Sequence, residues 1–300
     1  SCSCRSNCSI ERKCMNLREV RDRIASVKNT QKITSAMKLV SAAKLRRSQA
    51  AIEGMRQYSE KLDEMLQYAL GNVNNVNNAY TVAREVKRAA IVPVSSDTGL
   101  CGAFNSNVAR LTQETIEKYR TSGVAVEVFP VGHKIESAVK KMGFVNSAPL
   151  LQHLPSLQYT SVASAAKVLM QRFVSGEIDC VELIYTRLRS ASKLTAVSEM
   201  LLPLPLPAVN EDIKYLEFIV EPSATALLSS LIPKVVSLHL YSALLNSHAA
   251  EHSARMIAMQ TATDNAEELI AELTLEYNKG RQQAITNEIL DIVSGSSGMQ

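Results

Sequence analysis

The stretch MIAMQTATDNAEELIAELTLEY, residues 256–277, decides the fold of this 300-residue chain. Small or apolar side chains recur along it in alternating steps of three and four residues, which is the heptad spacing of a coiled-coil seam. The seam consists of Met256, Met259, Thr263, Ala266, Ile270, Leu273 and Tyr277. Residues on both sides of this stretch also have a helical composition. Pro233 lies within the longer helical segment, and we expect a kink or a split there. The pattern predicts a C-terminal coiled-coil helix over residues 222–300.

A second seam lies near the other end of the chain. Residues 16–71 contain no proline and a single glycine, Gly54. Steps of three and four within this segment align Ile52, Met55, Ser59, Leu62, Leu66 and Ala69 on one helix face. We predict an N-terminal coiled-coil helix over residues 15–78 that pairs antiparallel with the C-terminal helix. A homodimeric coiled coil would use the same pattern, so the sequence leaves both pairings open.

The middle of the chain shows short apolar runs that alternate with amphipathic segments. Predicted strands cover residues 89–94, 124–131 and 180–188, and predicted helices cover residues 107–119, 134–142 and 160–174. Residues 194–202 and 214–220 are two further predicted strands. Strands that alternate with helices are typical of an α/β fold with a mainly parallel sheet. We therefore expect a central Rossmann-like α/β domain over residues 79–221.

The composition is that of a soluble protein with a proper core, since 46% of the residues are hydrophobic and 21% are charged. A net charge of +4 is too small to indicate nucleic-acid binding by itself. A membrane-spanning helix needs about 20 consecutive apolar residues. The most apolar stretch, residues 227–245, contains Pro233, Lys234 and His239. We therefore expect contact with a membrane only indirectly, through a partner.

Cysteines cluster at the beginning of the chain. Residues 1–14 contain Cys2, Cys4, Cys8 and Cys14. Their spacing fits no paired C-x-x-C zinc site, and no histidine lies nearby. We predict that residues 1–14 are a disordered extension. Cys101 and Cys180 lie in apolar, strand-like surroundings, which predicts buried thiols.

Three short motifs resemble functional sites. The loop GLCGAFN, residues 99–105, lies where glycine-rich loops bind phosphate, but it matches neither common nucleotide-binding fingerprint. The turn at residues 131–134 could present amides to an anion, and solvated side chains are the simpler interpretation. His248, Glu251 and His252 resemble an H-x-x-E-H zinc pattern, although a long helix is a poor place for a catalytic cleft. We predict no catalytic site, no cofactor and no metal.

Basic side chains concentrate on the first predicted helix. They are Lys28, Lys32, Lys38, Lys44, Arg46 and Arg47. Basic helices bind nucleic-acid phosphates or acidic protein surfaces. No aromatic side chain that could stack on bases occurs there before Tyr58. The pattern favours an acidic protein groove as the partner, and a coiled-coil nucleic-acid-binding protein is the alternative.

Several motifs from separate parts of the chain resemble one and the same protein family. They are VKNTQKITSAMKLV (residues 27–40), GLCGAFN (99–105), ARMIAM (254–259), ATDNA (262–266), YNKGRQQAITNEI (277–289) and IVSG (292–295). Together they resemble the gamma-subunit family of the F-type ATP synthases, over nearly the whole chain. Residues 1–14 depart from the family pattern, and the chain lacks the cysteine-containing regulatory insert of chloroplast gamma subunits.

The resemblance implies a central-stalk rotor subunit with no catalytic site of its own. The coiled coil would turn inside a hexameric ring of alpha and beta subunits, and the α/β domain would contact the epsilon subunit and the c-subunit ring. Proton flow would drive the rotation, and the asymmetric shaft would move the catalytic beta subunits through conformations of different nucleotide affinity, for ATP synthesis or hydrolysis.

The resemblance also implies roles for individual residues. The residues that match the family's contacts with the beta subunit are Met37, Lys38, Arg281, Gln282, Thr286 and Glu288. Met256, Ile270 and the other seam residues would transmit torque. The implied location is the cytoplasmic face of a bacterial inner membrane, with the matrix face of the mitochondrial inner membrane as the alternative.

Overall fold

The computed structural model describes residues 17–71, 80–81, 84–144, 150, 158–190, 193–204 and 223–297. The expected strand at residues 214–220 and the cysteine-rich residues 1–14 lie outside these ranges. The chain divides into two compact units. One consists of residues 1–38 and 259–300, and the other consists of residues 39–258.

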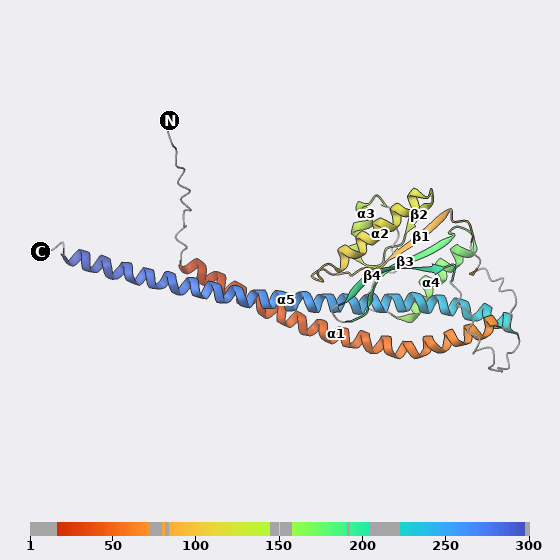
Figure 1. Cartoon of the computed structure of the whole chain (residues 1–300), viewed down its shortest axis with the longest axis horizontal. Helices are drawn as coiled ribbons and strands as arrows, with labels where there is room; N and C mark the ends of the chain where they lie inside the picture. Colours follow the sequence, from red (N-terminus) through yellow and green to blue (C-terminus); the bar gives the residue numbers. More distant parts are fainter. Residues whose placement is uncertain are drawn as a thin grey trace, which may run out of the picture. The chain divides into compact units, whose positions relative to one another are not determined.

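Two long helices begin and end the described chain (Figure 1). Helix α1 runs from Leu17 to Gly71 over 55 residues, and α5 runs from Ala224 to Ser297 over 74 residues. Helices of this length depend on a covered face, because intrinsic propensity alone stabilises a helix only weakly. The buried side chains of α1 fall into two sets, within each of which the members are separated by multiples of seven residues. They are Val20, Thr34, Ser41, Leu45, Ser48, Leu62, Leu66 and Ala69.

In the first unit, the beginning of α1 and the later part of α5 pack antiparallel. The hydroxyls of Thr34 and Thr263 are 2.8 Å apart. The Cδ2 atom of Leu17 lies 3.1 Å from the position that a Cβ on Gly280 would take. Leu17 precedes Thr34 by 17 residues and Gly280 follows Thr263 by 17, so both pairs obey one register. The helices therefore pair within one chain, which is the first of the two pairings that the sequence allows.

The second unit contains a mixed four-stranded sheet. Its strands are β1 (Arg88–Pro93), β2 (Ala125–Val128), β3 (Cys180–Leu188) and β4 (Leu194–Leu202). The order is β2-β1-β3-β4, in which β1 is parallel to β2 and β3, and β4 is antiparallel to β3. The sequence prediction of an α/β domain with a mainly parallel sheet is confirmed.

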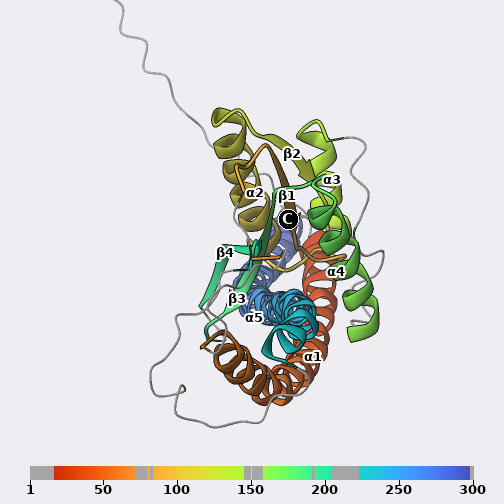
Figure 2. The ribbon, with the colours of Figure 1, turned by 90° about the vertical axis from the view of Figure 1, so that its right-hand side faces the viewer.

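Helices cover both faces of the sheet (Figure 2). They are α2 (Phe104–Thr121), α3 (His133–Lys141) and α4 (Tyr159–Val174), together with α5. Alternate residues of β1 point to opposite faces, as the strand period requires. Ile91 packs with α2 and α3, whereas Ala90 and Val92 join a larger core with α4 and α5. Leu62, Leu66 and Ala69 bring the end of α1 into that larger core.

Helix α5 continues through Pro233 without interruption, so the prediction of a split is wrong. Proline inside a helix removes one hydrogen bond and costs about 3 kcal/mol. Its neighbours Leu231, Ile232, Val235 and Val236 are all buried in the larger core. Burying an aliphatic side chain contributes about 1.5–3 kcal/mol, so this group offsets the cost of the proline.

Helix α5 also contains an 18-residue window with a mean hydropathy of 1.3, apolar enough by composition to cross a membrane. However, 56% of that window is buried inside the protein. Leu238, Leu240 and Leu244 in this region belong to the larger core. The apolar character of α5 is therefore that of a core helix.

Candidate functional site

In the first unit, the residues predicted to contact the beta subunit lie on two separate surfaces. Met37 follows Thr34 by three residues, so the common register places it level with Gln260 of α5. Arg281 lies 21 residues farther along α5, which corresponds to about 30 Å at ~1.5 Å per residue. Met37 and Lys38 are half-buried, whereas Arg281, Gln282, Thr286 and Glu288 are all exposed. The two sets therefore form separate surfaces along the coiled coil.

The last turns of α5 are exposed on nearly every side. Their large apolar side chains include Ile285, Ile289, Leu290 and Ile292, and the exposed fraction of Ile292 is 71%. The hydroxyl of Thr286 donates to the carbonyl oxygen of Gln282 at 2.9 Å, one turn earlier. Apolar and polar side chains therefore alternate around one exposed helix, which is typical of a surface that a protein partner covers.

The basic side chains of α1 are available to a partner. Lys28, Lys32, Lys44, Arg46 and Arg47 are exposed, and Lys38 is half-buried. Within the described ranges, none of these six residues forms an ion pair. In the part of the chain that the structure describes, no ion pair neutralises their charge, as expected of a face that meets acidic groups elsewhere.

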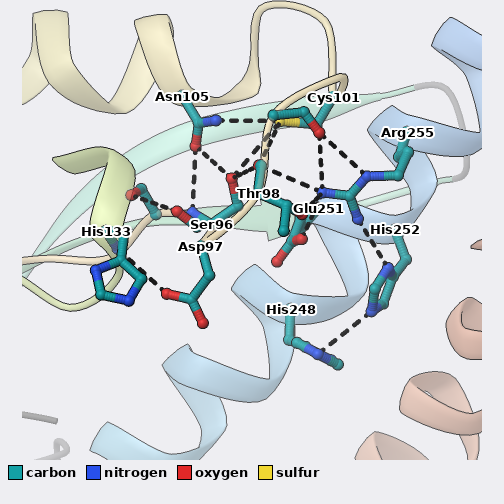
Figure 3. A network of polar contacts seen from close by, with 12 residues as sticks. Ser96, Asp97, Thr98, Cys101, Asn105, His133, His248, Glu251, His252 and Arg255 are labelled. Carbon is teal, nitrogen blue, oxygen red and sulfur yellow. Dashed lines mark hydrogen bonds and ion pairs between the residues drawn. The ribbon is translucent and has the colours of Figure 1, made fainter. Parts of the chain in front are cut away.

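The GLCGAFN loop lies in the second unit and packs against α5 (Figure 3). The Arg255 guanidinium donates to the Thr98 hydroxyl at 2.8 Å and to the Gly99 carbonyl oxygen at 3.3 Å. It also forms an ion pair with Glu251 at 2.7 Å, and both charged side chains are about nine-tenths buried. Burial raises the pKa of the Glu251 carboxyl, and the charge of Arg255 opposes that effect. The loop is therefore attached to α5 through the hydroxyl of Thr98, which precedes it, and through the Gly99 backbone oxygen.

The interior of this loop is occupied by its own side chains. Asn105 accepts from the Ser96 amide at 3.2 Å and donates to the Cys101 thiol at 3.2 Å. Leu100 has a φ of 63° and Gly102 a φ of 57°, and this sharp turn buries Cys101. Because its polar groups are engaged inside the turn, the loop has the character of a folded attachment point, and a phosphate cradle would need outward amides.

The second anion-binding motif, at residues 131–134, is engaged in a similar way. Asp97 accepts from the backbone amide of His133 at 3.2 Å (Figure 3). The hydroxyl of Ser95 accepts from the backbone amide of Ile135 at 2.9 Å. These two side chains satisfy amides at the beginning of α3, where an anion would otherwise bind. The turn therefore holds α3 against the loop.

The zinc-like motif forms contacts within the protein. The Nε2 atoms of His248 and His252 are 3.3 Å apart, and Nδ1 of His248 is 3.0 Å from the Ser48 hydroxyl. Glu251 is paired with Arg255. The described part of the chain contains no cluster of three residues suited to a metal ion. Burial, with positive charge on Arg255 and Lys44, lowers the pKa of His252 to about 3 and also lowers that of His248. Both imidazoles are therefore neutral at neutral pH.

Comparison with known proteins decides the family. Residues 16–299 match the family model described as ATP synthase. The ATP synthase gamma chain of Bacteroides thetaiotaomicron is 48% identical over 296 residues, which is 94% of this chain and 99% of the relative. The gamma chain of Flavobacterium johnsoniae is 44% identical over 287 residues, covering 95% of this chain and 99% of the relative.

The chain belongs to the ATP synthase gamma family.

Solved structures agree with this assignment. The central stalk and c-ring structure of the Tetrahymena thermophila mitochondrial ATP synthase contains a chain with a TM-score of 0.56 and 27% identity, covering 77% of this chain and 99% of that one. The Euglena gracilis mitochondrial enzyme contains a chain of the same fold, with a TM-score of 0.66 and 20% identity over 94% of each chain.

Membership in the gamma family makes the chain a central-stalk rotor subunit of a membrane-associated ATP synthase. The similarity to gamma chains covers both long helices and the α/β domain. Neither the family model nor these relatives support the nucleic-acid-binding alternative.

Sequence reasoning missed how closely α5 is tied to the gamma-family loop. Arg255 lies in the ARMIAM motif, yet its contacts with Thr98 and Gly99 were not predicted. The four-residue spacing of Glu251 and Arg255 was the available signal, because such pairs lie on one helix face. Ser48 was also missed, although it stands seven residues after Ser41 on the seam.

Proposed function

We propose that this gamma-family chain works as a mechanical coupler, with no catalytic site, in a proton-translocating complex. Its coiled coil turns inside a hexameric ring of alpha and beta subunits, and its α/β domain binds the epsilon subunit and the c-subunit ring. The observation that supports this best is the exposure of the last turns of α5, where Arg281, Gln282, Thr286 and Glu288 stand beside large apolar side chains. A surface of this kind suits a close-fitting protein ring.

The way in which the candidate groups are engaged supports the proposal of a chain with no catalytic role. Arg255 holds the GLCGAFN loop, Asp97 holds the beginning of α3, and the two histidines contact each other. A reacting group must have a polar atom directed at a substrate. The polar atoms of these candidates are directed at neighbours within the chain.

The most specific contact that we propose is between Arg281 and a carboxylate of a beta subunit. A guanidinium can grip a carboxylate through two parallel hydrogen bonds, and it stays charged through the whole cycle. Gln282 and Thr286 lie on the adjacent face and can add neutral hydrogen bonds. Gripping one conformation of a beta subunit more tightly than the others would bias its nucleotide affinity, because a contact shifts an equilibrium only by its differential free energy.

The second contact surface is Met37 with Lys38. Because it lies about 30 Å from Arg281 along the shaft, it must meet a different part of the ring. A half-buried methionine there allows close sliding contact. Placing a positive charge at Met37 would fix the shaft to an acidic neighbour and impair coupling. Met37→Leu keeps the size and polarity of the side chain and should therefore leave coupling intact.

The proposed location is the cytoplasmic face of a bacterial inner membrane, because the curated relatives named above are bacterial gamma chains. Contact with the membrane would be indirect, through the c-subunit ring. The burial of 56% of the most apolar window of α5 inside the protein supports this arrangement.

Native mass spectrometry of the tagged chain, released gently from its host, tests the assembly. We expect one copy of the chain with three alpha and three beta subunits, the composition of a hexameric ring around one shaft. A free chain or a homodimer under conditions that preserve ATPase activity would contradict the proposal.

Arg281→Ala tests the contact in the assembled complex. We expect ATP-driven proton pumping to fall by about tenfold, the equivalent of one charge-assisted hydrogen bond of 1.5 kcal/mol, with ring assembly retained. Gln283→Ala, an exposed neighbour, is the matched control and should pump normally. Normal pumping by Arg281→Ala would remove Arg281 from the contact.

A further inference from the structure

Four side chains form one polar path through the second unit (Figure 3). Arg255 Nη1 is 3.3 Å from Nδ1 of His252, and the Nε2 atoms of His252 and His248 are 3.3 Å apart. Nδ1 of His248 is 3.0 Å from the Ser48 hydroxyl on α1. We call Arg255, His252, His248 and Ser48 the histidine relay. It joins α5 to α1, and Arg255 extends it to the GLCGAFN loop.

The direction of every hydrogen bond in the relay follows from its first member. Arginine only donates, so Nδ1 of His252 must accept and its Nε2 must carry the hydrogen. That Nε2–H group can donate to Nε2 of His248. Nδ1 of His248 then carries the hydrogen and donates to the Ser48 hydroxyl. Both imidazoles are thus neutral and each has a single permitted tautomer.

Three of the four relay side chains are enclosed, and His248 is half-buried. His252, Ser48 and Arg255 are each less than a tenth exposed, and the two imidazole rings pack edge to face with centroids 4.4 Å apart. Buried polar groups cost free energy unless they are paired, so this path permits few alternative arrangements. A path with one allowed direction restricts the rotation and height of α1 against α5 at the level of Ser48 and His248.

A shared metal ion is a competing explanation for two imidazole nitrogens 3.3 Å apart. A metal held by both Nε2 atoms would leave the hydrogen of His252 on Nδ1, where it would face the N–H group of Arg255. The positive side chains of Arg255 and Lys44 also act on these histidines. Two donors facing each other beside two cations disfavour a metal, so a hydrogen-bonded path fits the positions better.

We propose that His248 and His252 are positioning residues, which lock Ser48 of α1 to Arg255 of α5 and thereby make the two helices and the GLCGAFN loop turn as one body. This inference rests on the proposed function as a mechanical coupler. Torque applied to the α/β domain reaches both helices through the relay. Breaking it lets α1 slip against α5, so that part of each rotation is lost as twist.

The test uses the assembled ATP synthase in inverted membrane vesicles, and it compares ATP-driven proton pumping with ATP hydrolysis. Ser48→Ala removes the acceptor at one end of the relay, and His252→Leu removes its middle. Pumping per ATP hydrolysed should fall by about twofold or more in each, the size expected for residues that modulate coupling. His252→Gln can both accept and donate, so it should restore most of the ratio.

Ser247→Ala is the matched control. Ser247 is buried on α5, and its hydroxyl has no hydrogen-bond partner in the part of the chain that the structure describes. Removing that hydroxyl should leave the ratio unchanged. If His252→Leu fails to assemble, Ser48→Ala still decides the matter, since it removes a single oxygen atom.

Two outcomes would overturn the inference. Equal ratios in Ser48→Ala, Ser247→Ala and the parent would show that the relay does not transmit torque. Equal losses of pumping per ATP hydrolysed in His252→Leu and His252→Gln would show that the imidazole of His252 fills space without relaying a hydrogen bond. Either result, with Arg281→Ala still uncoupling the complex, leaves the mechanical function standing. An unaltered parent that does not pump would instead remove the proposed function.

Discussion

Thr34 of α1 and Thr263 of α5 place their hydroxyl oxygens 2.8 Å apart across the coiled coil. The Thr34 hydroxyl also lies within hydrogen-bond distance of the Gln31 carbonyl oxygen, and the Thr263 hydroxyl lies within hydrogen-bond distance of the Met259 carbonyl oxygen. Hydroxyls at a seam position replace the apolar pairs that stabilise most coiled coils, and a polar pair specifies register at a cost in stability. This pair therefore fixes the height at which the two helices meet.

Replacing both members of the pair should stabilise the coiled coil. Thr34→Val alone removes one partner and should lower the free energy of unfolding by about 1 kcal/mol. Thr34→Val with Thr263→Val replaces both hydroxyls by methyl groups of similar shape and should recover that loss or exceed the parent. Urea unfolding monitored by circular dichroism at 222 nm measures both. A double variant that adds the two single losses would show that the pair is not coupled.

Arg255→Met should be among the most destabilising single changes in the second unit. It leaves the Glu251 carboxylate buried without its partner, and such a loss typically costs 3–5 kcal/mol. Glu251→Leu combined with Arg255→Met removes both charges and should cost less than Arg255→Met alone. Thermal inactivation of the assembled complex ranks the two variants against the parent. The reverse order would mean that the loop contacts of Arg255, and not its ion pair, dominate.

The histidine relay should make stability depend on pH. Burial lowers the pKa of His252 to about 3, whereas an unfolded histidine titrates near 6.5. The unfolded state therefore binds a proton first as the pH falls, so the contribution of His252 is constant above about pH 7 and decreases between pH 6.5 and pH 3. The limiting slope is about 1.4 kcal/mol per pH unit for one histidine.

Charged groups around the relay modulate this slope. Lys44 on α1 and Arg255 on α5 act on both histidines, and Asp97 acts on His248. Glu251 is paired with Arg255 and is acted on by the same Lys44 and Asp97. His252→Gln should reduce the slope of the free energy of unfolding against pH, between pH 6.5 and pH 5, by about the amount that one titrating histidine contributes. The slope is compared between variant and parent, so that the contributions of the carboxylates cancel. Parallel curves for the two proteins would contradict a buried neutral His252.

Gly54 offers a stabilising substitution. It lies in the interior of α1, and a Cβ added there would meet no atom within 4 Å. Gly54→Ala should therefore raise the free energy of unfolding by about 1 kcal/mol, because alanine loses less backbone entropy in a helix. Gly280→Ala is the comparison, since its Cβ would come within 3.1 Å of Leu17 Cδ2. A larger gain at Gly280 than at Gly54 would contradict this account.

The sequence by itself determined the elements of this protein. Heptad spacing depends only on which residues are apolar, so Leu62, Leu66 and Ala69 on α1 and Met259, Ala266 and Leu273 on α5 could be recognised without a structure. The alternation of short apolar runs with amphipathic segments gave the α/β domain for the same reason. Only the expectation of a split at Pro233 was wrong, because a local rule about proline ignores the core that surrounds α5.

Only the tertiary structure decided which polar groups meet. The pairing of Thr34 with Thr263, of Arg255 with Thr98 and of Ser48 with His248 joins residues separated by 229, 157 and 200 positions. Periodicity places a side chain on a face of its helix, but it does not fix the axial register or the rotation of one helix against another. Those two quantities are set by packing and by the pairing of buried polar groups, whose free energies depend on the whole fold.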